Sequence, residues 1–284
     1  MMGKICGFIR LMRPINSAMM GFAVFVGLVL ADPHFSSFNL LAVMYGFFTG
    51  FMLTAASMSI NDYYDRAIDA INEPSRPIPS GTVRTSEALV FVLFLSALGL
   101  GLAYLTSVLC LVVAVISWVV VVTYVTVGKR SGLPGNFLVS TCVAIPFIYG
   151  SIIALNQVTL SVLLFTLMAF LSNTGREITK GIVDVTGDKT ESIKTLAVRY
   201  GEKNAAVVAS AFYILAVTLT PIPWIWNLVS FWFIPIVLVT DIGLVACSAF
   251  LLRDSSRESA RKIKKLVLLL FVVGLLAYVI GVLR

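Results

Sequence analysis

Charged residues are scarce in this chain. They make up 12% of its 284 residues, whereas hydrophobic residues make up 59%. An ordinary soluble domain carries about 25% charged residues, so this composition excludes a water-soluble globular protein. Histidine occurs once, at His34, which excludes a metal site built from several histidines. The four cysteines form no Cys-x-x-Cys pair and are expected to be buried, reduced thiols.

Long apolar segments dominate the sequence instead. A helix needs about 20 mostly apolar residues to cross roughly 30 Å of hydrocarbon. Nine segments meet this requirement, at approximately residues 15–31, 39–60, 86–106, 107–127, 136–154, 159–178, 204–222, 231–252 and 265–283. The third and fourth abut at Thr106 and Ser107, which leaves open a single bent or re-entrant element there. The pattern predicts an all-α, polytopic membrane protein.

The basic residues lie almost entirely on one side of these segments. When alternate loops are assigned to alternate sides of the membrane, every Lys and Arg except Arg284 falls on the side of the N-terminus. By the positive-inside rule the N-terminus is then cytoplasmic and the C-terminus lies outside. The net charge of +7 is therefore attributed to topology, and no nucleic-acid partner is expected.

An acidic motif follows the second apolar segment. Residues 61–69 read NDYYDRAID. If this stretch is helical, Asp62, Asp65 and Asp69 fall at i, i+3 and i+7 and can point to one side. Hard oxygen ligands suit Mg²⁺, which usually completes its shell with water and substrate phosphates. The motif predicts a magnesium site facing the cytoplasm, and the alternative is a solvated helix end.

A second acidic motif follows the sixth apolar segment. Residues 176–188 read REITKGIVDVTGD. On a continuous helix one face would carry Glu177, Lys180, Asp184 and Asp188. A shift of four segments preserves orientation in the membrane, so the two motifs suggest a parallel internal repeat. Its halves would span about 10–130 and 131–255, followed by a ninth helix, within one domain of residues 1–284.

Basic side chains accompany both motifs, at Arg66, Arg76, Lys129, Lys180 and Lys189. Carboxylates alone repel an anion, but one or two Mg²⁺ ions invert the local charge and bridge to phosphate oxygens. A ligand with a diphosphate head and an apolar remainder, such as an isoprenyl diphosphate, fits this combination. Arg76 lies in a proline-rich loop, where it would either meet an anion or pair with Asp62 or Asp69.

The order and spacing of these motifs resemble the UbiA superfamily of intramembrane prenyltransferases over nearly the whole chain. The matching elements are Arg13-Pro14, residues 61–69, residues 76–81, Tyr124 with Lys129-Arg130, Asp184-x-x-x-Asp188, and Lys194-Thr195-Leu196. Gly128 and Ser192 depart from the residues that many members have there, and neither change removes a charged group. The resemblance implies a bundle of nine transmembrane helices around a central cavity, with cytoplasmic cap loops after the second and sixth helices.

The resemblance also implies Mg²⁺ as cofactor and a role for each site residue. The metal ligands would be Asn61, Asp62, Asp65, Asp69, Asp184 and Asp188. The diphosphate would contact Arg66, Lys129, Lys180 and Lys189, and the acceptor would contact Arg13, Asn16, Arg76 and Arg130. Catalysis would use Tyr124, Lys129 and Lys180, which stabilise charge as the diphosphate leaves and the acceptor attacks the allylic C1.

The acceptor is the least determined part of this prediction. The stretch from Arg176 to Leu196 most resembles the family members that transfer a geranylgeranyl group from its diphosphate to geranylgeranylglyceryl phosphate in archaeal ether-lipid synthesis. The alternatives are an aromatic acceptor in quinone synthesis, of the 4-hydroxybenzoate or dihydroxynaphthoate type, and an ion-coupled transporter with a carboxylate relay. The expected partners are the donor, a phosphorylated lipid-like acceptor and the bilayer, with no obligate protein partner.

Overall fold

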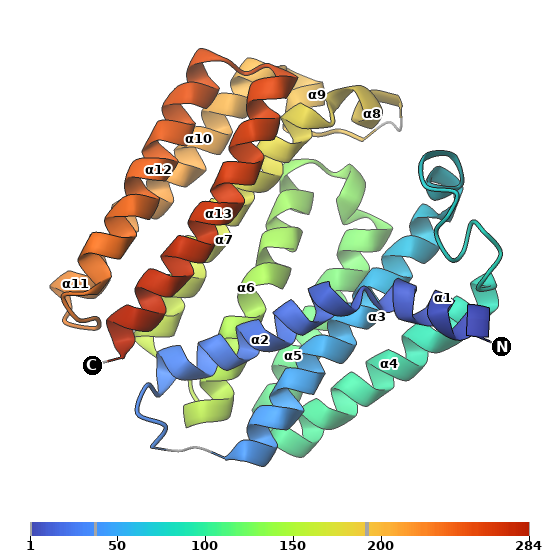
Figure 1. Ribbon diagram of the computed structural model, residues 1–284, viewed down its shortest axis with the longest axis horizontal. Helices are drawn as coiled ribbons and strands as arrows, with labels where there is room; N and C mark the ends of the chain where they lie inside the picture. The colour runs from blue at the N-terminus through green and yellow to red at the C-terminus, as the bar shows by residue number, and fades with distance from the viewer. Residues whose placement is uncertain (1, 37–38, 191–192, 284) are drawn as a thin grey trace. The chain divides into compact units, whose positions relative to one another are not determined.

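The computed structural model describes residues 2–36, 39–190 and 193–283 (Figure 1). Within these ranges all regular elements are helices. Ser192 and Arg284, which entered the family resemblance and the topology count, lie outside the described residues.

Eight of the described helices are long and apolar enough to cross a membrane. They are α2 (Pro14–Ala31), α3 (Leu40–Asn72), α4 (Thr85–Thr106), α5 (Val108–Thr126), α6 (Leu133–Leu155), α10 (Glu202–Leu219) with its continuation α11 (Pro221–Ile225), α12 (Phe233–Arg253) and α13 (Arg257–Val282). The segment predicted at 159–178 is α7 (Leu160–Val183), a helix of similar length whose last third is too polar for the same criterion. Ser107 adopts extended backbone between α4 and α5, so the abutting segments are two separate helices.

Contacts divide the chain into two compact units, which are described separately. Unit 1 comprises Met1–Leu28, Ser37–Thr126 and Pro146–Gln157, and unit 2 comprises Val29–Ser36, Val127–Ile145 and Val158–Arg284. Unit 1 holds the first acidic motif, and unit 2 holds the second.

Helix α3 is the centre of unit 1 and packs against α1 (Met2–Met12), α4 and α5 (Figure 1). Small buried residues such as Ala55, Ala56 and Gly99 let these helices approach closely. A cluster of buried apolar residues, which includes Leu11, Ile78 and Val83, packs α1 against the loop at residues 73–84. The cytoplasm-predicted end of α3 is therefore covered by packed structure from two other parts of the chain.

Helix α3 contains 33 residues, more than one membrane crossing requires. The Asn39 side chain caps its first turn by accepting hydrogen bonds from the amides of Leu41 and Ala42 at 3.0 and 3.2 Å. The helix ends at Asn72, since Pro74 lacks an amide hydrogen and disfavours helical backbone at the residue before it. Residues 61–69 are consequently helical throughout.

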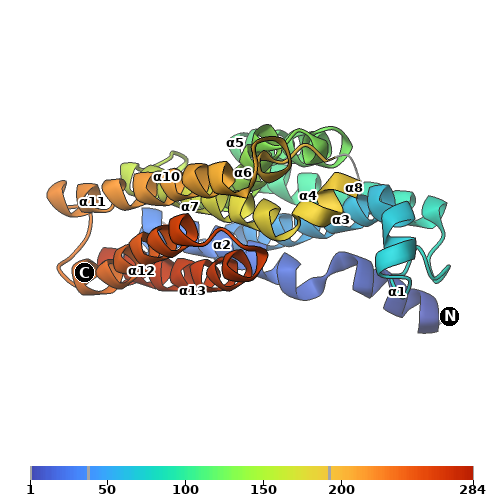
Figure 2. The same ribbon diagram turned by 90° about the horizontal axis from the view of Figure 1, so that it is seen from above.

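Helix α7 has the corresponding place in unit 2, where it packs against α10 and α13, and α12 packs against the same two helices (Figure 2). Its buried face carries Ile178 and Ile182. Gly175 lets the ring of Tyr213 from α10 approach, and the Tyr213 hydroxyl lies 3.0 Å from Thr179 Oγ1. These contacts fix the polar end of α7 just before the second acidic motif.

Candidate active site

The first acidic motif occupies the last turns of α3, where its four predicted metal ligands separate into two pairs. Asp62 and Asp69 are buried, with 3% and 6% of their surface exposed. Asn61 and Asp65 are half-buried, one turn apart, and Asn61 Nδ2 donates a hydrogen bond of 2.9 Å to Asp65 Oδ2. The motif thus presents an oxygen-rich pair at its edge and encloses its other two carboxylates.

Asp62 is bound by Arg13, which lies between α1 and α2. Arg13 Nη2 donates a hydrogen bond of 2.6 Å to Asp62 Oδ1, and Arg13 Nη1 lies 3.7 Å from Met58 Sδ. The backbone of Arg13 has a φ of +45°, a conformation that costs energy in a residue other than glycine. This strained residue joins α1 to α2 and places its guanidinium beside the acidic motif.

Arg76 joins the remaining buried carboxylate to the same network. Its Nη1 lies 2.6 Å from Asp69 Oδ2 and 3.5 Å from Asp62 Oδ1. Partial burial lowers the pKa of Arg76, but the hydrogen bond to Asp69 and the charges of both aspartates outweigh burial and raise that pKa overall. The pairing of Arg76 with Asp62 or Asp69, one of the two alternatives predicted from sequence, is confirmed for both aspartates.

The other predicted site residues of unit 1 lie around this network. Arg66 is exposed, donates a 2.7 Å hydrogen bond to the Tyr63 carbonyl, and places its Cζ 4.6 Å from the centroid of the Tyr63 ring. Asn16 is exposed in the first turn of α2, and Tyr124 is half-buried near the end of α5.

The second acidic motif lies where a helix stops. Helix α7 ends at Val183, Asp184 adopts a turn conformation, and the short helix α8 (Val185–Thr190) carries Asp188 and Lys189. The continuous helical face predicted for residues 177–188 is therefore wrong beyond Val183. Val183, Val185, Thr186 and Gly187 flank Asp184 and all have low helix propensity, which favours an interruption there.

A small ion-pair network precedes that break. Glu177 Oε1 lies 3.0 Å from Arg176 Nη1, and Glu177 Oε2 lies 3.5 Å from Lys180 Nζ. Arg176 and Glu177 are outside the predicted site set, although the signal was available: they are adjacent opposite charges inside an otherwise apolar helix. Together with Lys180 they place one carboxylate and two cations near this end of α7.

Two sequence-predicted segments meet within unit 2. Lys129 and Arg130 form a 3₁₀ turn, η1 (Gly128–Arg130), and the amide of Lys194 lies 3.4 Å from the Arg130 carbonyl oxygen. Gly132 follows with a φ of +77°, and a β-carbon there would collide with the Lys194 carbonyl. The Lys129-Arg130 and Lys194-Thr195 segments, noted separately in the sequence, are thus neighbours.

The donor set fits magnesium that is shared with a ligand. Among the described residues, no group of three His, Cys, Asp or Glu side chains is arranged to hold a metal ion alone. In unit 1 the Asn61–Asp65 pair offers neighbouring oxygens, and in unit 2 Asp184 and Asp188 separately offer two carboxylates. Mg²⁺ is commonly bound by one or two carboxylates, with substrate phosphates and water completing its shell.

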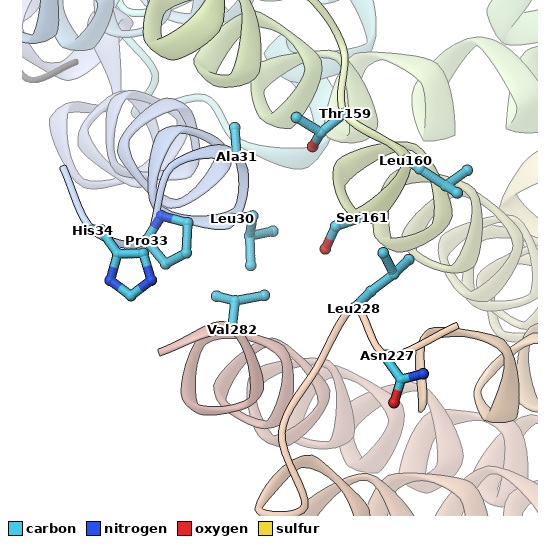
Figure 3. A pocket seen from close by; sticks show the side chains of 10 residues that line it. All are labelled: Leu30, Ala31, Pro33, His34, Thr159, Leu160, Ser161, Asn227, Leu228 and Val282. Carbon is cyan, nitrogen blue, oxygen red and sulfur yellow. The ribbon is translucent and has the colours of Figure 1, made fainter. Parts of the chain in front are cut away.

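A cavity of about 270 Å³ in unit 2 is not part of this site (Figure 3). It is lined by Leu30, Ala31, Pro33, His34, Thr159, Leu160, Ser161, Asn227, Leu228 and Val282. Leu160 and Ser161 begin α7 and Thr159 caps it, whereas Asp184 follows its last residue, and a helix of 24 residues is about 36 Å long. The cavity contains none of the residues predicted to bind substrate.

The sequence profile of the UbiA prenyltransferase family matches residues 20–281. The chain belongs to this family. Among its UbiA relatives, the digeranylgeranylglyceryl phosphate synthase of Archaeoglobus fulgidus is 37% identical over 277 residues, covering 95% of this chain and 93% of the relative. The synthase of the same name from Methanopyrus kandleri is 34% identical over 276 residues, covering 97% and 99%. The protein is therefore a prenyltransferase and, with its eight apolar helices, a multi-pass membrane protein.

Solved structures agree with the UbiA assignment. One from a study of digeranylgeranylglyceryl phosphate synthase in membranes is 30% identical, has a TM-score of 0.89 and covers 99% of both chains. A UbiA homologue from Archaeoglobus fulgidus bound to GPP and Mg²⁺ is 18% identical, has a TM-score of 0.68 and covers 96% of this chain and 99% of that one. The second likeness establishes the fold alone.

Proposed function

We propose that this prenyltransferase transfers a geranylgeranyl group from geranylgeranyl diphosphate to geranylgeranylglyceryl phosphate and releases diphosphate. The observation that carries this proposal is the end-to-end similarity to several relatives that are named for this product. A phosphorylated acceptor also needs cations beyond those that serve the donor, and the Arg13 and Arg76 guanidiniums supply two of them.

We propose Mg²⁺ as the cofactor and an isoprenyl diphosphate as the donor. The complex of a UbiA homologue with GPP and Mg²⁺ supports both assignments. In this chain Asn61, Asp65, Asp184 and Asp188 would hold the metal. When bound, the ion supplies positive charge that stabilises the departing diphosphate. Asp62 and Asp69, the other two ligands predicted from sequence, are already engaged by arginines.

The cations of the chain would hold the same leaving group. Lys129, Lys180, Lys189 and Arg66 are the proposed diphosphate contacts, and Arg130 and Asn16 remain proposed acceptor contacts. Donors aimed at a developing negative charge lower the barrier because they need no rearrangement during the reaction. The C1–O bond to diphosphate breaks, a C1–O bond to the acceptor hydroxyl forms, and the hydroxyl proton is released. Tyr124 would stabilise the allylic cation through its ring.

We also propose a topology in which α7 is the ninth membrane helix. Its first 13 residues, 160–172, contain no charged side chain, and its polar residues gather in the last third. The distribution of Lys and Arg supports a cytoplasmic N-terminus, an outer C-terminus, and cytoplasmic cap loops after α3 and α7. The internal repeat over about 10–130 and 131–255, within one domain of residues 1–284, remains part of this proposal.

A product assay tests the reaction. The purified enzyme in nanodiscs is incubated with Mg²⁺, geranylgeranyl diphosphate and one acceptor at a time: geranylgeranylglyceryl phosphate, 4-hydroxybenzoate or a dihydroxynaphthoate. The expected result is product with the phosphorylated glycerol lipid. Product with an aromatic acceptor alone would overturn the acceptor assignment. Absence of diphosphate release with every pair, under conditions where a related synthase is active, would overturn the donor assignment.

A further inference from the structure

A single carboxylate oxygen draws two arginines together in unit 1. Asp62 Oδ1 lies 2.6 Å from Arg13 Nη2 and 3.5 Å from Arg76 Nη1. Because both nitrogens contact the same oxygen, they can be no farther apart than these two distances added together. Two like charges repel at such a separation, so the shared carboxylate is what makes the arrangement stable.

Both arginines are held in place by structure outside the ion pairs. Arg13 occupies the strained junction after α1, and Leu11 and Gly7 of that helix are packed against the loop at residues 73–84. Arg76 lies in that loop, where its amide donates to the Glu73 carbonyl and its carbonyl accepts from the Ser80 amide. Energetically costly backbone is retained where a side chain must be accurately placed.

The network exposes its cations and hides its anions. The side chains of Arg13 and Arg76 are 32% and 31% exposed, whereas those of Asp62 and Asp69 are 4% and 8% exposed. A ligand approaching this surface therefore meets guanidinium groups. Each guanidinium has five N–H donors in a planar fork that matches the oxygens of a phosphate. Such a surface suits an anion and not a metal cation.

We propose that Asp62 is a positioning residue: it holds Arg13 and Arg76 as a guanidinium pair, and this pair binds the phosphate of the acceptor. Asp69 holds Arg76 from the other side. The metal-binding part of this motif is then confined to Asn61 and Asp65, since Asp62 and Asp69 are buried and engaged by the two arginines. This inference rests on the proposed function, because it requires a phosphorylated acceptor.

Two isosteric variants separate the roles of Asp62 and Asp65. Acceptor affinity is measured without donor, by titrating enzyme in nanodiscs with geranylgeranylglyceryl phosphate and with geranylgeranylglycerol, which lacks the phosphate. Metal affinity is measured as the Mg²⁺ concentration that half-saturates binding of an unreactive geranylgeranyl thiolodiphosphate. Asp62→Asn should reduce the preference for the phosphorylated acceptor about tenfold and leave the Mg²⁺ requirement within about twofold. Asp65→Asn should raise the Mg²⁺ requirement about tenfold and leave the preference unchanged.

A double-mutant cycle shows whether Asp62 acts through Arg13. In an Arg13→Gln background, Asp62→Asn should cause little further loss of phosphate preference, because Arg13 is already absent and Arg76 is still held by Asp69 at 2.6 Å. Glu258→Gln, which removes a carboxylate 2.9 Å from Lys262 on the surface of α13, is the matched control and should change neither titration. If Asp62→Asn does not fold, Arg13→Lys and Arg76→Lys keep the charges and should each weaken phosphate preference through loss of the fork geometry.

The outcomes distinguish this inference from the proposed function. An Mg²⁺ requirement that rises as much in Asp62→Asn as in Asp65→Asn, or equal phosphate preference in all variants, would overturn the positioning role. If wild-type enzyme shows no preference for the phosphorylated lipid and prenylates aromatic acceptors, the proposed function fails. In that case the Mg²⁺ titrations still report separately whether Asp62 binds metal.

Discussion

The two acidic motifs have similar carboxylate spacing but different local structure. In the first, α3 continues through all its carboxylates, and arginines from two other segments neutralise the buried pair. In the second, α7 stops at Val183 and its two aspartates lie on a turn and a short helix. A continuous helix fixes which carboxylates are enclosed and which are left at its edge, whereas a helix break places each carboxylate by the backbone of the turn.

The two motifs, both proposed to bind metal, therefore differ in what holds their carboxylates in place. The ion pairs of unit 1 tie α1, the loop at residues 73–84 and α3 together. In unit 2 the segments around the second motif are held by the tight backbone turn at Gly132 and by apolar side chains packed along α7. Substitutions of charge at the motifs should therefore destabilise unit 1 more. Substitution of the turn glycine Gly132 in unit 2 should cost more than substitution of the loop glycine Gly81 in unit 1.

The largest effects are expected at one proposed metal ligand in each motif, Asp65 in the first and Asp184 in the second. Asp65→Ala and Asp184→Ala should each lower the rate of prenyl transfer about 100-fold or more, since a lost ligand removes metal that stabilises the leaving group. The measurement is radiolabelled product formation at saturating donor and acceptor. Adding excess EDTA to wild-type enzyme should abolish activity, and Mg²⁺ should restore it. Full activity in either variant would contradict the metal role proposed for the motif that carries it.

Removing Arg76 tests the dependence of unit 1 on charge. Arg76→Met leaves Asp69 and Asp62 with fewer partners in a buried place and should lower the free energy of unfolding by about 2 kcal/mol, a value reduced for the partial exposure of Arg76. Lys180→Met removes a half-exposed ion pair of 3.5 Å in unit 2 and should cost about 0.5 kcal/mol or less.

The buried cysteines report these losses unit by unit. Cys110 lies in unit 1 and Cys247 in unit 2, and both are buried. In variants that keep a single cysteine, a thiol-reactive dye can label the buried thiol only when the structure around it opens. The labelling rate therefore measures local unfolding around that cysteine. Arg76→Met should accelerate labelling of Cys110 in particular. If Arg76→Met and Lys180→Met accelerate labelling of Cys110 equally, the ion pairs of Arg76 are not what stabilises unit 1.

Much of this fold follows from the sequence. Apolar length predicts the membrane helices, and eight of the nine predicted segments meet the length and hydropathy criteria in the structure. The spacing within residues 61–69 predicts one helical side, because nothing there breaks a helix before Pro74. The basic and acidic residues of both motifs are likewise visible as charges in an otherwise apolar chain.

The rest depends on contacts that no local pattern encodes. Arg13 and Asp62 are separated by 49 residues, so their ion pair depends on how α1 packs against α3 and the loop at residues 73–84. The positive φ of Arg13 is equally hidden, since that conformation is rare for arginine and is imposed by tertiary structure. The helix break at Asp184 could be predicted only in part, because weak helix propensity favours it but packing readily overrides propensity.

The last comparison concerns two glycines, one in the loop that follows the first motif and one in the turn that is packed against Lys194. Gly81 and Gly132 both have positive φ, at +73° and +77°. A β-carbon at Gly81 meets open space, so Gly81→Ala should cost about 1 kcal/mol from backbone strain alone. At Gly132 it would also strike the Lys194 carbonyl, so Gly132→Ala should cost about 2 kcal/mol and accelerate labelling at Cys247 more than Gly81→Ala does at Cys110. If Gly81→Ala instead has the larger effect, the backbone around Gly132 accommodates a β-carbon more readily than the proline-rich loop accommodates one at Gly81. Unit 2 would then not depend on the turn at Gly132.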